Sequence, residues 1–199
     1  MNGLPGIRRY DENELAKKLA VLTPRMRASF ACACAERLMS TYQWFCHATG
    51  SGNYGLVREA LDAAWSANTP EQIAELGSMR KRIVGAAPHT QDSRMFPGAA
   101  VAENAVASVC YAMEVCLTGD IQASVWAARQ LYEAADAVVQ QSAPVHTYIA
   151  DIDGEKPVRM MLDSIAAALS DASNLNAADL RIKAAEDGER FLAILKGPT

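Results

Sequence analysis

Four charged residues are spaced so that helices would bring them together, and they could do acid–base or ligand-binding chemistry. Glu36 and Arg37 stand in a run of Ala and Cys residues, and Arg58 and Asp62 are four residues apart, where side chains of one helix meet. A charge in an apolar helix must find a partner or reach the surface. Two interpretations stay open: a structural buried ion-pair network, or a polar pocket between two helices.

The sequence contains short matches to nucleotide-binding and metal-binding motifs, but the surrounding residues do not fit such sites. Residues 50–55 spell G-x-G-x-x-G, but a long predicted helix precedes them, whereas the dinucleotide fingerprint follows a strand. A tight turn at positive φ fits these glycines better. No histidine has the spacing of a zinc or di-iron helix. Cys32 and Cys34 would point away from each other on a helix, so they cannot share a metal. We predict no metal and no cofactor.

Nucleophilic catalysis has no clear signature in the chain. The G-x-S-x-G elbow is absent, and Cys46 and His47 are adjacent on a helix, where neighbouring side chains diverge. A dyad of distant residues, such as Cys110 with His89, stays open. The odd number of cysteines, five, favours reduced and mostly buried thiols. We expect the chain not to be an enzyme.

The composition is that of a globular protein with a slightly acidic balance. Half of the 199 residues are hydrophobic and the net charge is −4. This excludes a disordered chain and argues against direct nucleic-acid binding, which needs a basic surface. No run of about 18 uncharged apolar residues appears, and the first residues lack the apolar stretch of a signal peptide. We expect a cytoplasmic protein with no membrane segment.

Almost every periodic segment has helical spacing, and none shows the sustained alternation of strands. We predict an all-α, single-domain bundle of about seven or eight helices with antiparallel helix hairpins. The helix after Thr23-Pro24 is apolar around most of its axis, which places it in the core. The last helix is weakened by Gly188. The predicted helices span approximately 11–22, 24–49, 56–65, 70–87, 99–117, 121–139, 157–169 and 177–195.

Charge is spread unevenly along the chain. Residues 1–99 carry a net charge of +3 and residues 100–199 a net charge of −7. An acidic half could bind a basic protein by electrostatic complementarity, although it could also serve solubility alone. The candidate partner-binding residues are Asp151, Asp153, Glu155, Glu186, Asp187 and Glu189.

A dozen positions between Phe30 and Trp65 match a family pattern in order and spacing. Among them are Glu36, Arg37, Tyr42, Phe45, Cys46, Thr49, Gly50, Gly52, Arg58, Asp62 and Trp65. The stretch resembles the YjaG-like bacterial proteins, known as domain of unknown function 416. The resemblance continues more loosely to about Gln140, although Val101 replaces the family's usual proline. It divides the single domain 1–199 into a family-like core, 1–140, and divergent acidic C-terminal helices, 141–199. It implies an all-helical cytoplasmic homodimer and no particular reaction.

These features favour a non-catalytic protein-binding module. The most concrete form is an immunity or antitoxin-type inhibitor that neutralises a basic bacterial toxin, for example a nuclease, by direct binding. One alternative is a helical adaptor or self-assembling homodimer. The other is a small-ligand binder or enzyme with a pocket at Glu36, Arg37, Arg58 and Asp62.

Overall fold

The computed structural model describes residues 9–87, 98–142 and 151–197. Within these ranges the chain forms eight α-helices, two short 3₁₀ turns and no strand, which confirms the predicted all-α bundle. The 3₁₀ turns are η1 (Val84–Ala86) and η2 (Ile152–Gly154). The helices are α1 (Glu12–Ala20), α2 (Pro24–Thr49), α3 (Tyr54–Ser66), α4 (Pro70–Ile83), α6 (Ala99–Thr118), α7 (Ile121–Ser142), α8 (Lys156–Asn174) and α9 (Ala177–Lys196).

Side-chain caps and first-turn prolines set most of the helix boundaries. The side chains of Asp11, Thr23 and Asn176 each accept a hydrogen bond from a backbone N–H in the first turn of the following helix. Thr69 and Gln72 form a reciprocal capping box at the start of α4. These are local signals, so the predicted boundaries agree with the structure to within a few residues.

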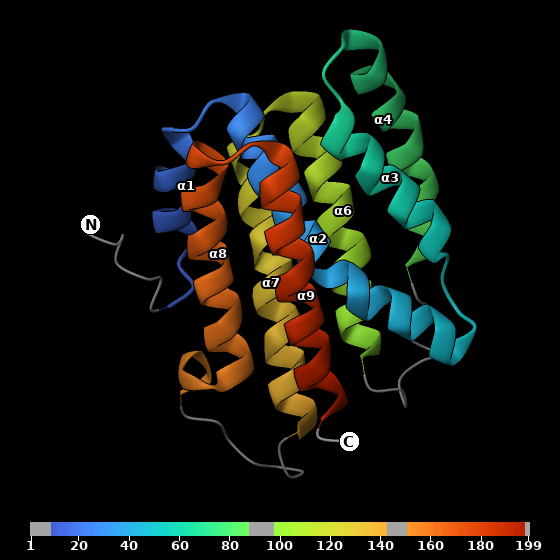
Figure 1. Cartoon of the computed structure of the whole chain (residues 1–199), viewed down its shortest axis with the longest axis vertical. Helices are drawn as coiled ribbons and strands as arrows, with labels where there is room; N and C mark the ends of the chain where they lie inside the picture. Colours follow the sequence, from blue (N-terminus) through green and yellow to red (C-terminus); the bar gives the residue numbers. More distant parts are fainter. Residues whose placement is uncertain (1–8, 88–97, 143–150, 198–199) are drawn as a thin grey trace.

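Helix α2 is the centre of the bundle, as its wide apolar surface predicts. It contacts α3, α6, α7, α8 and α9, and the middle of the helix is buried on every side. Figure 1 shows α6, α7, α8 and α9 running alongside one another, with α2 packed between them. Helices α3 and α4 pack together on the α6 side of the molecule, and α1 packs on α7. Each charged or polar side chain on the middle of α2 therefore needs a hydrogen-bond or ion-pair partner inside the bundle.

Helices α6 and α7 form the predicted antiparallel hairpin. Gly119 ends α6 in the left-handed conformation, with φ of 67°, and Asp120 then caps α7 by accepting from the backbone N–H groups of Gln122 and Ala123. Among the described residues, α6 is the one helix long and apolar enough to cross a membrane. It packs against α2, α3, α4 and α7, and a core helix of a bundle passes the same test of length and hydropathy.

The contact between α2 and α9 is unusually close. A Cβ atom added to Gly188 would lie 2.7 Å from the carbonyl oxygen of Arg37, which is a backbone atom of α2. Glycine costs helical stability within α9, but here it lets two helix backbones approach. The weak point that the sequence indicates in the last helix is thus a packing contact.

Candidate functional site

The carboxylate of Glu36 is the centre of a polar network that joins three helices. Glu36 lies on α2 and is 5% exposed. It accepts two hydrogen bonds from the guanidinium of Arg58 on α3, at 2.5 and 3.0 Å, and a third at 2.8 Å from the indole N–H of Trp65. The bidentate geometry is the strong form of an arginine–carboxylate pair. Glu36, Arg58 and Trp65, three residues of the family-like pattern, therefore bind one another.

Asp62 and Arg181 complete this network, which we call the Glu36 cluster. Asp62 pairs with Arg58 at 2.7 Å, the four-residue spacing that the sequence indicates. Arg181 from α9 donates to Asp62, and its Nε lies 3.4 Å from a Glu36 oxygen. Two carboxylates thus face two guanidinium groups. Arg181 could not be identified from the sequence, because nothing local marks a partner 119 residues from Asp62.

Electrostatics within the Glu36 cluster favour a structural role. Burial lowers the pKa of Arg58, but Glu36 and Asp62 outweigh burial and leave this pKa above its ordinary value. One buried atom, Nε of Arg58, lacks a hydrogen-bond partner among the described residues. The oxygens of Glu36 accept from three donors, so they are poorly available to take a proton from a substrate.

Arg37 belongs to a separate network between α2, α8 and α9. Its side chain is 1% exposed and pairs with Asp187 of α9 at 2.9 Å. It also donates to the carbonyl oxygen of Ala33, and Ser164 of α8 donates to Asp187 at 3.4 Å. Arg190 lies 3.3 Å from the same carboxylate. The charge of Arg37 is therefore balanced across α2, α8 and α9.

A third group of family-like residues holds the turn between α2 and α3. The hydroxyl of Tyr42 donates to the carbonyl oxygen of Ala86 at 2.8 Å and accepts from the backbone N–H of Asn53 at 3.0 Å. Gly52 has φ of 82°, and a Cβ there would lie 2.9 Å from both Tyr42 Oη and Cys46 Sγ. Gly50 and Gly52 of the G-x-G-x-x-G run therefore form a tight helix–helix turn at positive φ, as the context of the motif predicts.

A cavity of about 220 Å³ lies between α2, α3 and the start of α9. Its walls include Cys32, Ala64 and Trp65, with polar atoms from Arg25, Ser29, Ser66 and Asn68. A space between the second and third helices was one interpretation of the charged residues. Of the Glu36 cluster, however, it is Trp65 that lines this cavity; the paired charges lie outside its lining.

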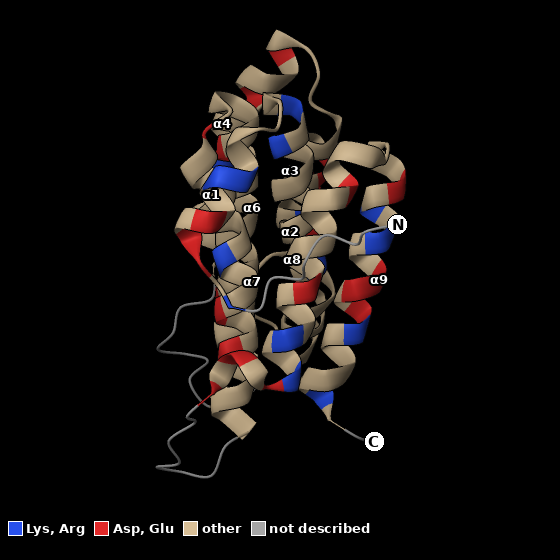
Figure 2. Ribbon diagram, turned by 90° about the vertical axis from the view of Figure 1, so that its left-hand side faces the viewer, with Lys and Arg blue, Asp and Glu red and all other residues tan. Residues whose placement is uncertain are grey.

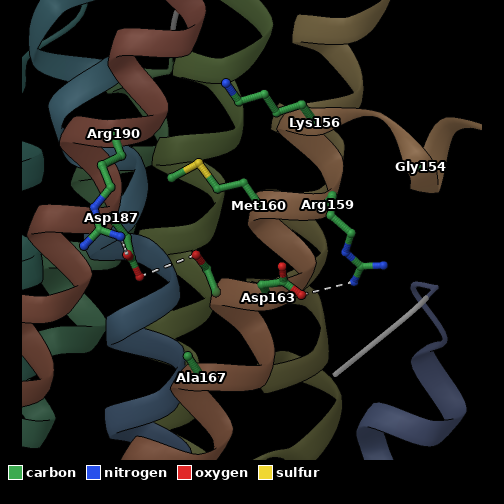
Figure 3. A pocket seen from close by; sticks show the side chains of 9 residues that line it. Gly154, Lys156, Arg159, Met160, Asp163, Ala167, Asp187 and Arg190 are labelled. Carbon is green, nitrogen blue, oxygen red and sulfur yellow. Dashed lines mark hydrogen bonds and ion pairs between the residues drawn. The ribbon is translucent and has the colours of Figure 1, made fainter. Parts of the chain in front are cut away.

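The larger of the two described cavities is an open groove of about 630 Å³ between α8 and α9. Figure 3 shows Lys156 and Met160 projecting from α8 over the groove, with Asp187 and Arg190 on the α9 side. Arg159 turns instead toward Asp163, 3.4 Å away. The groove is lined by charged residues of both signs together with Met160 and Ala167.

The six acidic candidates for partner binding lie on two stretches beside this groove, and several have internal roles. Asp187 pairs with Arg37, as described above. Asp153 lies 3.6 Å from Arg9, and Asp151 caps η2. Glu189 accepts from Ser40 on α2 at 2.6 Å, and Glu186 lies 3.8 Å from Arg190. Glu155 is exposed at the start of α8.

Helices α8 and α9 are electrically neutral as a set. They carry six basic and six acidic residues, and Figure 2 shows both signs along α9. The acidic excess of the second half of the chain comes from α6, α7, Asp120 and the stretch 151–155. Helices α6 and α7 carry one basic residue, Arg129, and four acidic residues, which are Glu103, Glu114, Glu133 and Asp136.

The α6–α7 hairpin also bears an aromatic pair that the sequence analysis did not single out. Tyr111 of α6 and Trp126 of α7 have ring centroids 5.4 Å apart, and Trp126 is 38% exposed. The pair lies beside acidic side chains: Glu114, one turn from Tyr111, pairs with Arg80 of α4 at 3.3 Å. On α7, Arg129 pairs with Glu133 at 2.6 Å. We call Tyr111, Trp126 and the acidic residues Glu114 and Glu133 the aromatic–acidic face.

Catalytic and metal chemistry find little support in the described part of the chain. No group of three or more His, Cys, Asp or Glu side chains could hold a metal among residues 9–87, 98–142 and 151–197. Two histidines, His89 and His146, lie outside the described residues, and so does any dyad of His89 with Cys110. Burial raises the pKa of the Cys110 thiol to about 11.

Comparison with known proteins gives a family and a fold. The family DUF416, described as a protein of unknown function, matches residues 14–134. The fold is similar to the crystal structure of a DUF416 family protein from Shewanella baltica OS155, with a TM-score of 0.70 and 16% sequence identity. The similarity covers 88% of this chain and 93% of that one, so it extends into the C-terminal helices. No curated protein matches the chain.

Proposed function

We propose that this chain, which belongs to the DUF416 family of proteins of unknown function, acts as a non-catalytic protein-binding module in the bacterial cytoplasm. In its most concrete form it is an immunity-type inhibitor that binds a basic toxin, for example a nuclease, and occludes its active surface. The observation that carries the proposal is the Tyr111–Trp126 pair, in which Trp126 is 38% exposed, on two helices with a net negative charge.

The aromatic pair fits a protein-binding role on physical grounds. Tryptophan and tyrosine are enriched among the residues that carry most of the energy of protein interfaces, because they bury a large area with few rotatable bonds. Trp126 already packs against Tyr111, with the two rings tilted by 49°, so little side-chain freedom is lost when a partner covers its exposed part. The pair is therefore preorganised as an anchor.

The charge of the surrounding helices selects the chemistry of the partner. Helices α6 and α7 together hold three more acidic than basic residues, whereas α8 and α9 are neutral. A net negative charge on the two helices that carry the aromatic pair would steer a basic partner and raise its association rate. The stretch 151–155 adds three further carboxylates, Asp151, Asp153 and Glu155.

The pairing of the family-like charged residues supports the non-catalytic part of the proposal. Glu36, Arg37, Arg58 and Asp62 each bind an opposite charge from another helix. Such buried ion pairs fix how the helices pack. The exposed residues on the outer helix faces can then differ between relatives that bind different partners. The charged side chains of the Glu36 cluster also lie outside the lining of the two described cavities.

Affinity capture from the native host tests the proposal. Three tagged versions are compared: the native chain, Trp126→Ala, and Ile182→Ala as a matched control, since Ile182 is an exposed apolar residue on α9 at 59% exposure. We expect a basic protein to be captured by the native chain and the control, to be lost with Trp126→Ala, and to form a stoichiometric complex when both proteins are purified.

Two results would oppose the proposal. One is equal capture of the same protein by Trp126→Ala, which would move the interface elsewhere. The other is recovery of the bait alone. In that case a second candidate, a homodimer formed through the same aromatic–acidic face, is favoured by the exposed Trp126. Light scattering after size exclusion would then give a dimer for the native chain and a monomer for Trp126→Ala.

A further inference from the structure

The cavity between α2, α3 and the start of α9 has no part in the proposed protein-binding function. Its volume is about 220 Å³, and it is smaller and more enclosed than the groove between α8 and α9. A water molecule takes up about 30 Å³, whereas sites for drug-sized ligands span about 300–1,000 Å³. The cavity therefore has the size of a site for a small metabolite.

The apolar part of the lining is held in place by a hydrogen bond. It consists of Ala28 and Cys32 of α2 and of Ala64 and Trp65 of α3. The indole N–H of Trp65 donates to Glu36 at 2.8 Å, and Glu36 is itself paired with Arg58. This bond fixes the Trp65 ring before any ligand arrives, so little side-chain freedom is lost on binding. The lining therefore suits a short apolar group.

The lining carries one formal charge, and that charge is positive. Arg25, in the first turn of α2, is the charged residue of the lining, and no described Asp or Glu lines the cavity. Within residues 9–87, 98–142 and 151–197, Arg25 forms no ion pair. Ser29 and Asn68 add neutral hydrogen-bonding groups. An unpaired guanidinium in such a setting recognises a carboxylate, because hydrogen bonds between these two charged groups are strong and directional.

Two helix ends of opposite polarity also contribute to the lining. Ala177 is the first residue of α9, whereas Trp65 and Ser66 are the last residues of α3, and all three line the cavity. The N-terminal end of a helix carries partial positive charge and the C-terminal end carries partial negative charge. The cavity therefore offers a negative end of a helix in addition to the positive charge of Arg25.

The backbone groups at the end of α3 are available to a ligand. The backbone N–H groups of Asn68 and Thr69 both donate to the side chain of Gln72, so neither closes onto the last carbonyl groups of α3. At the start of α9, the side chain of Asn176 accepts from Asp179 and leaves the first N–H of the helix for another partner. The end of α3 can thus accept hydrogen bonds from an ammonium group.

We propose that this cavity binds a small free amino acid. Its carboxylate lies against Arg25 and the start of α9, its ammonium group against the end of α3, and its apolar side chain against Trp65. The proposal is independent of the protein-binding function, because no residue of the aromatic–acidic face lines the cavity. Trp126→Ala, which should remove partner binding, should therefore leave amino-acid binding intact.

Isothermal titration calorimetry of the full-length protein tests the proposal. The probes are glycine, L-alanine, L-valine and L-leucine, which share both charged groups and differ in the size of the apolar part. We expect at least one of them to bind with a dissociation constant of about 1 mM or lower. The tightest binder is then compared with the matched carboxylic acid, which lacks the ammonium group, and with the matched amine, which lacks the carboxylate. Each analogue should bind at least about tenfold more weakly, since it loses hydrogen bonds made by a charged group.

Variants and an NMR signal locate the binding. Arg25→Ala should weaken binding at least about tenfold. Arg82→Ala is the matched control, since Arg82 is an exposed arginine of α4 outside the lining, and it should bind as the native chain does. Circular dichroism checks that both variants fold. In proton–nitrogen correlation spectra the indole signal of Trp65, assigned with Trp65→Phe, should move during the titration, while the signals of Trp44 and Trp126 stay in place.

Several results would overturn the proposal. It fails if none of the amino acids binds, or if either analogue binds as tightly as the amino acid itself, since both charged groups are then not recognised together. It also fails if Arg25→Ala binds as tightly as Arg82→Ala, or if the Trp65 indole signal does not move at saturation.

Discussion

The close contact of Gly188 with α2 gives the sharpest prediction about stability. In an ordinary helix, replacing glycine by alanine stabilises the protein by about 1 kcal/mol. At position 188 the new Cβ would lie 2.7 Å from Arg37 O and 3.2 Å from Arg37 C, both backbone atoms of a buried helix. Neither backbone atom can move away from the new Cβ by a rotamer change, so one of the two helices would have to shift.

The magnitude follows from two opposing effects. Overpacking of a well-packed core costs about 1–3 kcal/mol. The gain in helix propensity offsets about 1 kcal/mol of this. From these two effects we expect Gly188→Ala to lower the free energy of unfolding by about 0–2 kcal/mol, which corresponds to a fall in melting temperature of up to roughly 8 °C. The adjacent Arg37–Asp187 ion pair would be displaced with the helix, which adds to the loss.

Gly77 is the matched control. It also lies within a helix, α4, but a Cβ there meets nothing within 4 Å. Gly77→Ala should therefore raise the free energy of unfolding by about 0.5–1 kcal/mol. Urea unfolding followed by circular dichroism measures both variants against the native chain. A Gly188→Ala protein as stable as Gly77→Ala would refute the account of the α2–α9 contact.

Three further predictions concern the buried polar groups. Glu36→Ala leaves Arg58 without its main partner and should lower the free energy of unfolding by about 3–5 kcal/mol in urea titrations. Arg129→Ala is the control: it breaks an exposed pair and should lower this free energy by at most about 1 kcal/mol. Equal losses in the two variants would contradict a structural role of the Glu36 cluster. Tyr42→Phe removes a donor to one backbone group and an acceptor from another and should cost about 1–3 kcal/mol, so an unchanged urea midpoint would argue against the turn contacts. Burial raises the pKa of Cys110 from its ordinary value of 9.0 to about 11, so the native state binds this proton more tightly than the unfolded state does. The free energy of unfolding should therefore fall as pH rises from 9 to 11, and Cys110→Ala should make this fall smaller. The same slope in the native chain and in Cys110→Ala would contradict the raised pKa.

Local signals in the sequence were sufficient for the helices and their ends. Thr23 with Pro24 and Thr69 with Pro70 each combine a capping side chain with a proline that suits a first helical turn, so the helix starts could be predicted without tertiary information. The four-residue spacing of Arg58 and Asp62 likewise predicted their ion pair.

The tertiary partners could not be predicted, because they depend on how distant helices pack. The sequence places Asp187 in an acidic stretch, but in the structure Asp187 pairs with the buried Arg37, next to the close contact of Gly188 with α2. Tyr111 and Trp126 lie on two helices, and the register between these helices sets the contact of the two rings. Arg181 joins the Glu36 cluster from the far end of the chain. These contacts depend on distances between helices that are far apart in the chain, and a single sequence does not specify those distances.

The measurement that tests the central claim most directly is the dissociation constant of the purified complex with the captured basic partner, for the native chain and Trp126→Ala. A buried interface tryptophan contributes about 2 kcal/mol or more, so we predict weakening of about 30-fold or more for Trp126→Ala. Ile182→Ala should bind as the native chain does, and the native affinity should fall as salt rises, since opposite charges meet. An unchanged dissociation constant for Trp126→Ala would contradict the proposal that the aromatic–acidic face binds the partner.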